Sequence, residues 1–170
     1  MARRILLDGY ETLEDILADE LDVLFVGYNP SPLAVERAHY YPRNTNRFWE
    51  DLHEAAFVPR VLRQKDEDLL LPGFGLGVTD VIKRPTPNID GLAREEFERG
   101  FARLAGIVAA RRPRVVCFNG LGLLEHYRRL KMPLEPAQIW VVPSTSPRNQ
   151  GLRVARLQAF KALKAHLEEH

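Results

Sequence analysis

Four polar residues that could carry chemistry each follow a short apolar run of this sequence, and they are Asn29, Asp80, Asn119 and Ser144. A carboxylate can orient or activate a water molecule, whereas a neutral asparagine amide can orient water but cannot take its proton. If the apolar runs are parallel strands, these side chains lie at one edge of a sheet, where the active-site crevice of α/β proteins forms. The alternative is that Asn, Asp and Ser simply form turns, and topology alone does not name a reaction.

The elements that would position these residues alternate along the chain. Apolar runs that end in turn residues predict strands at residues 21–27, 78–82, 115–118 and 139–142. Apolar residues spaced three and four apart predict helices at residues 45–56, 93–110, 121–130 and 153–168. The glycines of residues 73–77 indicate a flexible segment. We therefore expect one α/β domain over residues 1–170, with three α/β/α layers and a mostly parallel central sheet.

Composition limits the class of protein. The chain has 170 residues and a formal net charge of +1, so it is not a strongly basic DNA-coating protein. Cys117 is the single cysteine, lies in an apolar run and is expected in the core. One cysteine excludes a disulfide framework, an iron–sulfur cluster and a cysteine-rich zinc site. We expect no metal, no cofactor, no membrane span and a cytoplasmic location.

Three sequence blocks together resemble the uracil-DNA glycosylase superfamily, and they are most similar to its mismatch-specific uracil/thymine-DNA glycosylase branch. The blocks are Gly27-Tyr28-Asn29-Pro30, the segment 38–49 that ends in Asn46-Arg47-Phe48-Trp49, and Val142-Pro143-Ser144-Thr145-Ser146-Pro147-Arg148. Residues 77–86 and 118–120 resemble two further, weaker blocks. The similarity keeps its order from about residue 20 to residue 165.

The resemblance implies a base-excision repair enzyme that flips a base out of double-stranded DNA and hydrolyses its N-glycosidic bond. By this likeness Asn29 positions the attacking water, Tyr41 stacks on the flipped base, and Tyr28 and His39 contribute to the base pocket. The loop of Ser144, Thr145, Ser146 and Arg148, with Asn119 beside it, would contact DNA, and Arg148 would fill the space that the flipped base leaves. The likeness also implies a monomer without cofactor, associated with the bacterial nucleoid.

Departures from the family pattern leave alternatives open. Ser31-Pro32 follows Asn29-Pro30 where relatives have a glycine and an apolar residue, and Pro147 stiffens the arginine loop. Asp80 stands where relatives carry asparagine or lysine, and it is either a second water-directing group or an exposed strand-end residue. The expected substrate is uracil, preferably in G·U mismatches, and no lysine lies on the motif positions for strand cleavage. The alternatives are another deaminated or damaged base, such as hypoxanthine, xanthine or ethenocytosine, and a non-catalytic DNA-binding domain of the same fold.

Overall fold

Four parallel strands form the central sheet of the computed structural model, which describes residues 4–169 apart from the side chains of residues 149 and 150. The strands lie in the order β4-β3-β5-β6. Their bounds are β3 Val23–Gly27, β4 Leu76–Asp80, β5 Val115–Asn119 and β6 Gln138–Val142. Gly27 is the register partner of Asp80 and Asn119 that of Val142, so the carboxyl ends of the strands are level with one another. The predicted parallel sheet is confirmed.

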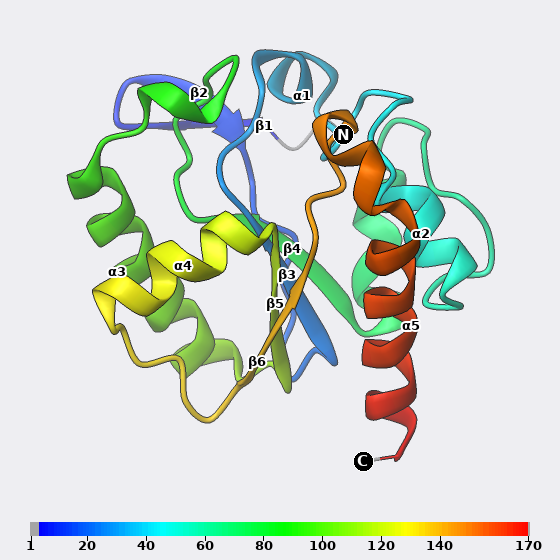
Figure 1. The fold of residues 1–170 in the computed structure, drawn as a ribbon. Coiled ribbons are helices and arrows are strands. Elements are labelled where there is room, and N and C mark those ends of the chain that lie inside the picture. The colour runs from blue at the N-terminus through cyan, green and yellow to red at the C-terminus, as the bar shows by residue number, and fades with distance from the viewer. Residues whose placement is uncertain (1–3, 170) are drawn as a thin grey trace.

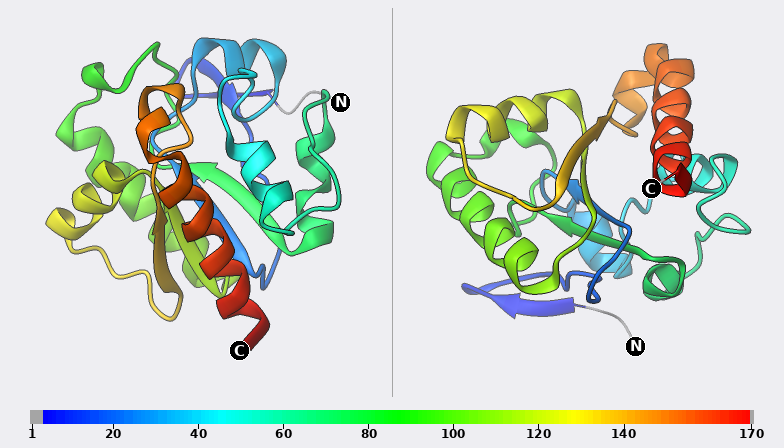
Figure 2. Two further views of the ribbon diagram at one scale, coloured as in Figure 1. Left: turned by 45° about the vertical axis from the view of Figure 1, so that its right-hand side comes forward. Right: turned by 90° about the horizontal axis from the view of Figure 1, so that it is seen from below.

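Helices cover both faces of this sheet, as Figure 1 shows and the end-on view of Figure 2 repeats. Helices α2 (Phe48–Glu54) and α5 (Arg153–Glu169) cover one face. Helices α3 (Arg94–Arg111) and α4 (Leu121–Leu130) cover the other. Strand β3 is buried throughout, and its alternate residues enter different cores: Phe25 packs with the α2–α5 side and Val26 with the α3–α4 side. The three-layer α/β/α architecture is therefore as expected.

Several elements were not predicted. A hairpin of β1 (Arg4–Leu7) and β2 (Tyr10–Leu13) lies beside the main sheet. Helix α1 (Pro32–Arg37) begins at the unusual Ser31-Pro32 pair. The Ser31 hydroxyl accepts a hydrogen bond of 3.1 Å from the Ala34 N–H, and Pro32 occupies the first helical turn, where its missing N–H costs nothing. Three short 3-10 helices complete the described part of the fold: η1 Glu67–Phe74, η2 Ile89–Gly91 and η3 Pro147–Leu152.

The expectation of a flexible segment through Gly77 is wrong. Gly77 lies buried inside β4, which begins at Leu76, two residues before the predicted start. A Cβ atom on Gly77 would lie 2.5 Å from the backbone oxygen of Ile16, which bridges to Val78 from outside the sheet. Glycine is therefore required here by close packing of two backbone segments and does not signal mobility.

A buried ion pair joins the two helices of one layer. Arg156 on α5 donates from Nε to Oδ2 of Asp51 on α2 over 2.5 Å, and the two side chains are 1% and 2% exposed. Loss of one partner from a buried pair leaves the other charge without compensation, which is strongly destabilising. The pair thus fixes the position of α2, whose start adjoins the cavity described below. Among the described helices none is long and apolar enough to cross a membrane.

Candidate active site

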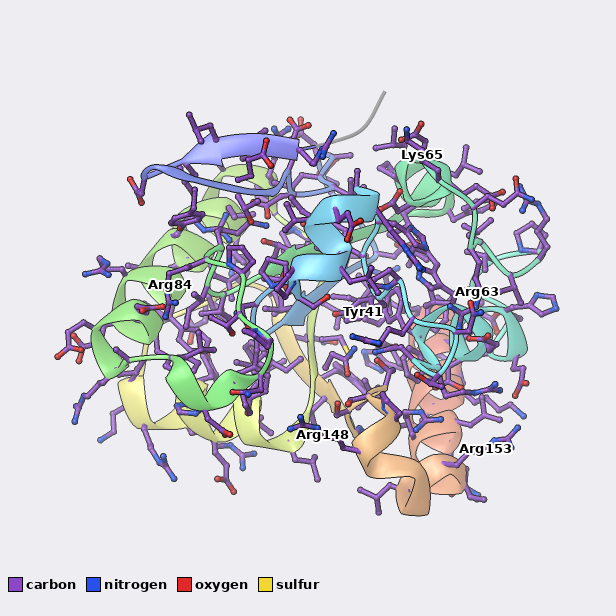
Figure 3. The ribbon with its side chains drawn as sticks, turned by 90° about the horizontal axis from the view of Figure 1, so that it is seen from above. Tyr41, Arg63, Lys65, Arg84, Arg148 and Arg153 are labelled. Carbon is purple, nitrogen blue, oxygen red and sulfur yellow. The ribbon has the colours of Figure 1, made fainter. Side chains whose placement is uncertain are left out.

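A cavity of about 830 Å³ opens at the carboxyl ends of the parallel strands. This is the edge where the strand-end residues were expected to meet. Nine of the ten predicted site residues line the cavity: Tyr28, Asn29, Tyr41, Asp80, Asn119, Ser144, Thr145, Ser146 and Arg148. Figure 3 looks onto this edge, with Tyr41 near the centre and Arg148 at the border. The tenth, His39, lies elsewhere.

The side-chain amide of Asn29 is held in one orientation. Its Nδ2 donates to the backbone oxygen of Arg84 over 2.8 Å and to the hydroxyl oxygen of Thr86 over 2.7 Å. A third hydrogen bond joins the same two loops: the Thr86 N–H donates to the Pro30 backbone oxygen over 3.2 Å. Because both amide hydrogens have acceptors in the loop after β4, the Oδ1 atom of Asn29 remains to accept a hydrogen bond from a ligand or a water in the cavity.

Asp80 and Tyr41 both approach Gly27, which lines the cavity with them. A Cβ atom on Gly27 would lie 2.6 Å from Oδ1 of Asp80 and 2.9 Å from the hydroxyl oxygen of Tyr41. Only a residue without a side chain leaves room for both groups. Asp80 is 3% exposed, and its Oδ2 is buried without a hydrogen-bond partner among the described residues. An unpaired buried carboxylate oxygen is costly in a purely structural residue.

The environment of Asp80 shifts its ionisation. Burial raises the pKa of Asp80 from 3.8 to about 6, with Asp15 adding to the rise and Lys83 and Arg103 opposing it. Burial and the nearby Asp80 carboxylate also raise the pKa of the Tyr41 hydroxyl well above its usual value, so Tyr41 remains protonated. Asp80 therefore exchanges its proton near pH 6, which makes it a candidate for a group that acts on water.

A largely covered charge cluster, with only Arg103 partly exposed, lies behind Asp80. The carboxylate of Asp15 binds Lys83 Nζ over 2.9 Å with one oxygen and Arg103 Nη1 over 2.6 Å with the other. Arg103 also donates to the hydroxyl of Thr79 and, over 2.5 Å, to the backbone oxygen of Asp80. Burial alone would raise the pKa of Asp15, but the two cations outweigh it and hold that pKa below its usual value. The cluster thus places the positive charges of Lys83 and Arg103 near Asp80, while Asp80 itself stays buried.

Two tyrosines border the cavity in different ways. Tyr41 adopts a left-handed backbone conformation with φ of 49°, and its ring packs on Phe48 with centroids 4.4 Å apart. Tyr28 packs its ring edge-on against Phe97 and His126, with both centroid distances 6.1 Å. Tyr41 is thus fixed on the α2 side of the cavity and Tyr28 on the α3–α4 side.

Two hydrogen bonds hold the arginine loop, residues 144–148 after β6, to the end of β5. Asn119 donates from Nδ2 to the Thr145 hydroxyl over 2.9 Å, and the Thr145 N–H returns a bond of 3.0 Å to Asn119 Oδ1. Thr145 is 1% exposed, and this pair shapes the loop where both residues line the cavity. Ser144 and Ser146 accept bonds from the backbone N–H groups of Ser146 and Arg148, which leaves their hydroxyl hydrogens for another acceptor. Arg148 itself is exposed.

The comparison with family models decides the class. The model described as the uracil DNA glycosylase superfamily matches residues 14–168, which is most of the chain. The chain belongs to the uracil DNA glycosylase superfamily. A solved structure with the same fold is the solution NMR structure of a protein from Methanosarcina acetivorans that was assigned provisionally as a uracil DNA glycosylase. The identity is 24% over 92% of this chain and 97% of that chain, with a TM-score of 0.67.

His39 does not reach the cavity of this superfamily member, and its expected place in the base pocket is not supported. The side chain is 4% exposed and its ring stacks on Trp49 with centroids 5.0 Å apart and an interplanar angle of 11°. Its Nδ1 lies 3.5 Å from Oδ2 of the buried Asp68. The left-handed turn at Ala38 sends His39 into the core while Tyr41 turns toward the cavity.

Sequence reasoning missed the residues that orient the predicted ones. Thr86 was included only as the end of the weaker sequence block 77–86, although it holds the amide of Asn29. Gly27 was recognised as part of a motif, but the approach of Asp80 and Tyr41 to its Cα was not foreseen. The available signal was position: in this glycosylase-superfamily fold the residues after β4 must pass the end of the adjacent strand β3, where Asn29 lies.

Proposed function

We propose that this protein is a monofunctional DNA glycosylase that flips uracil, preferably from G·U mismatches, and hydrolyses its N-glycosidic bond to leave an abasic site. The observation that carries the proposal is the fixed amide of Asn29, whose Oδ1 is left facing a cavity that also holds the raised-pKa carboxylate of Asp80. A base stacked in a duplex cannot enter such a cavity unless its nucleotide is extruded.

In the proposed reaction, different residues hold the base and direct the water. The flipped base lies between the walls that carry Tyr41 and Tyr28, and stacking on one aromatic ring contributes about 1–3 kcal/mol. The electron pair of the breaking C1′–N bond leaves with the base, and the sugar becomes a cation. Water held by Asn29 Oδ1 then attacks C1′, and Asp80 orients the water and receives its proton.

The absence of strand cleavage is proposed from the position of Lys83. An amine that forms a Schiff base must reach the sugar, but Lys83 is 5% exposed and binds Asp15 and the Tyr40 hydroxyl. No lysine is among the described residues that line the cavity. We further propose that the enzyme acts as a monomer on double-stranded DNA in the cytoplasm, at the nucleoid of a bacterial cell.

The test is a panel of end-labelled duplexes that each carry one modified base, followed by alkaline cleavage at abasic sites. We expect cleavage of the G·U duplex with and without EDTA, and an intact strand when alkali is omitted. The panel includes A·U, single-stranded uracil, hypoxanthine, xanthine and ethenocytosine. Intact G·U strand at enzyme excess would contradict the proposal, and stronger cleavage of another base would reassign the substrate within the same chemistry.

Replacing Arg148 with alanine is expected to slow extrusion of the base and to weaken discrimination between G·U and A·U pairs. The planar guanidinium of Arg148 lies at the cavity border and can occupy the gap in the duplex and contact the widowed base. Base flipping costs a few kcal/mol, so loss of the group that fills the gap should cost about tenfold or more in rate.

Arg153→Ala is the matched control, because Arg153 is also exposed on this edge and lies close to the same loop (Figure 3). Flipping is followed by the fluorescence of a 2-aminopurine placed next to the target base. An Arg148→Ala protein that flips and discriminates like wild type would remove Arg148 from this role.

A further inference from the structure

Arg63 makes an unusual set of contacts beside the cavity. Its Nη1 donates to the backbone oxygen of Arg43 over 3.1 Å, and its Nη2 donates to the backbone oxygens of Asn44 over 3.4 Å and Asn46 over 2.5 Å. Its Nε donates to Oε1 of Glu50 over 2.8 Å, and Nη2 contacts the other carboxylate oxygen. One guanidinium thus binds three carbonyl groups of a single loop and fixes itself to helix α2.

These contacts separate Arg63 from the other cations of the same edge. Figure 3 shows Arg63, Lys65, Arg148 and Arg153 around Tyr41, and by position alone all four would count as phosphate contacts. Lys65, Arg148 and Arg153 are exposed and show no ion pair in the part of the chain that the structure describes. The side chain of Arg63 is only 19% exposed and its three nitrogen atoms are all engaged within the protein. A donor already bound to protein acceptors is a poor ligand for a phosphate.

The loop that Arg63 binds, residues 43–46, connects the principal parts of the cavity. Arg43, Thr45 and Asn46 line the cavity, and Tyr41 precedes the loop. At its far end the Asn46 side chain accepts a bond of 3.0 Å from the Phe48 N–H at the start of α2. The Arg47 N–H then donates to the Thr145 oxygen over 3.0 Å, which links this loop to the arginine loop after β6.

No other described side chain donates to the carbonyl groups of Arg43, Asn44 and Asn46 together, although the Asn46 N–H also donates to the Arg43 oxygen over 3.0 Å. Short loops without regular structure depend on such donors, because carbonyl groups that find no partner favour other backbone conformations. A lysine cannot replace this geometry, since its ammonium is a point charge whereas the guanidinium presents five donors in a fixed plane.

We propose that Arg63 is a positioning residue that holds loop 43–46 in the shape needed to receive the extruded nucleotide, and that it does not contact DNA itself. We call the hydrogen bonds from Arg63 to residues 43–46 the brace. Through the hydrogen bond between Arg47 and Thr145, the brace also sets the position of the arginine loop. The inference rests on the proposed function for its catalytic consequence, whereas the brace can be measured without any activity.

The experiment compares wild type with Arg63→Lys, Arg63→Met and the control Arg60→Met. Arg60 lies three residues earlier, forms an ion pair with Glu67, and has a side chain that is 57% exposed. Single-turnover cleavage of a G·U duplex gives the half-saturating enzyme concentration and the maximal rate, each at several salt concentrations. Amide hydrogen exchange measured by NMR reports on residues 43–47 in the absence of DNA.

For both Arg63 variants we expect the half-saturating enzyme concentration to rise about tenfold, because charge-assisted hydrogen bonds are lost. The maximal cleavage rate should change by less than about threefold. Arg60→Met should match wild type. The slope of log affinity against log salt should stay as in wild type, because one lost phosphate contact would flatten it by about 0.9. Exchange should accelerate at residues 43–47 and remain unchanged in the sheet.

Three results would overturn the proposal. A flatter salt slope in Arg63→Met would make Arg63 a phosphate ligand, and full affinity in Arg63→Lys would show that charge alone suffices. Equal hydrogen exchange at residues 43–47 in all four proteins would exclude the brace. If wild-type protein cleaves none of the duplexes, the proposed function fails, and faster local exchange in both Arg63 variants would still support the brace.

Discussion

Replacing Asn29 with alanine is expected to lower the single-turnover rate on a G·U duplex by about 10²- to 10³-fold, the usual loss when one preorganised polar group is removed from an active site. Affinity for the duplex should change little, because Asn29 acts on water and reaches no phosphate-binding surface. The expectation depends on the two acceptors that fix the amide, the Arg84 carbonyl and the Thr86 hydroxyl. The measurement is cleavage rate at saturating enzyme, with binding followed separately by fluorescence anisotropy.

Thr86 provides the matched controls for Asn29. Thr86→Val keeps the shape but removes one acceptor, so the amide is less firmly held and the rate should fall about tenfold, the equivalent of one hydrogen bond. Thr86→Ser restores the acceptor and should restore the rate. If Asn29→Ala cleaves at the wild-type rate, or if Thr86→Ser is as slow as Thr86→Val, the orientation of this amide does not limit the reaction.

Replacing Asp80 with asparagine is expected to slow cleavage by about 10²- to 10⁴-fold above neutral pH, the contribution typical of general-base assistance. Because the pKa of Asp80 is raised to about 6, the wild-type rate should increase as the pH passes upward through about 6 and then level off. The variant has no group to ionise there, so its rate should lack this step. The difference between the two proteins is then smallest at acidic pH.

The same substitution should stabilise the fold, and the sign follows from the raised pKa. Between pH 4 and 6 the unfolded state releases the proton of Asp80 while the folded state keeps it, so wild-type stability falls as the pH rises through this window. A shift from 3.8 to about 6 corresponds to about 3 kcal/mol at pH 7. Asp80→Asn should recover up to that amount above pH 6 and almost none below pH 4.

Urea unfolding of both proteins across pH 4–8 measures the effect. Asp15→Asn is not a suitable control, because it leaves Lys83 and Arg103 without their carboxylate. Asp19→Asn serves instead, since the Asp19 side chain is 73% exposed and lines no part of the described cavity. Unchanged activity of Asp80→Asn on every uracil substrate would reduce Asp80 to a strand-end residue and leave the water to Asn29.

The central sheet could be predicted because its strands are short apolar runs that end in turn residues. Level carboxyl ends in a parallel sheet then bring residues distant in sequence together, which is why Asn29, Asp80 and Asn119 were correctly expected at one edge. The family motifs added Tyr41 and the loop that ends in Arg148. The start of β4 was missed because Gly77 was interpreted as a source of flexibility, whereas close backbone packing requires it.

What remained unpredicted depends on contacts between residues distant in the sequence. Arg63 lies 17–20 residues from the loop that it binds, and nothing in its neighbours distinguishes it from the exposed Lys65. Of the three consecutive residues His39, Tyr40 and Tyr41, the last two line the cavity and the first does not, and only the turn geometry decides this difference. The β1–β2 hairpin did carry a local signal: Asp8-Gly9 adopt positive φ angles of 50° and 86°, as two-residue hairpin turns require.

The charge cluster behind Asp80 depends on residues of the amino-terminal segment. Asp15 follows the β1–β2 hairpin, and its carboxylate compensates both Lys83 and Arg103. The Thr12 hydroxyl, 0% exposed, donates to the Lys83 backbone oxygen from the same segment. A chain shortened to start after residue 16 would keep every motif that resembles the family and still lose the wall that supports Asp80. The amino-terminal segment therefore supports the surroundings of Asp80, and its removal would leave the buried Lys83 and the partly exposed Arg103 without the Asp15 carboxylate.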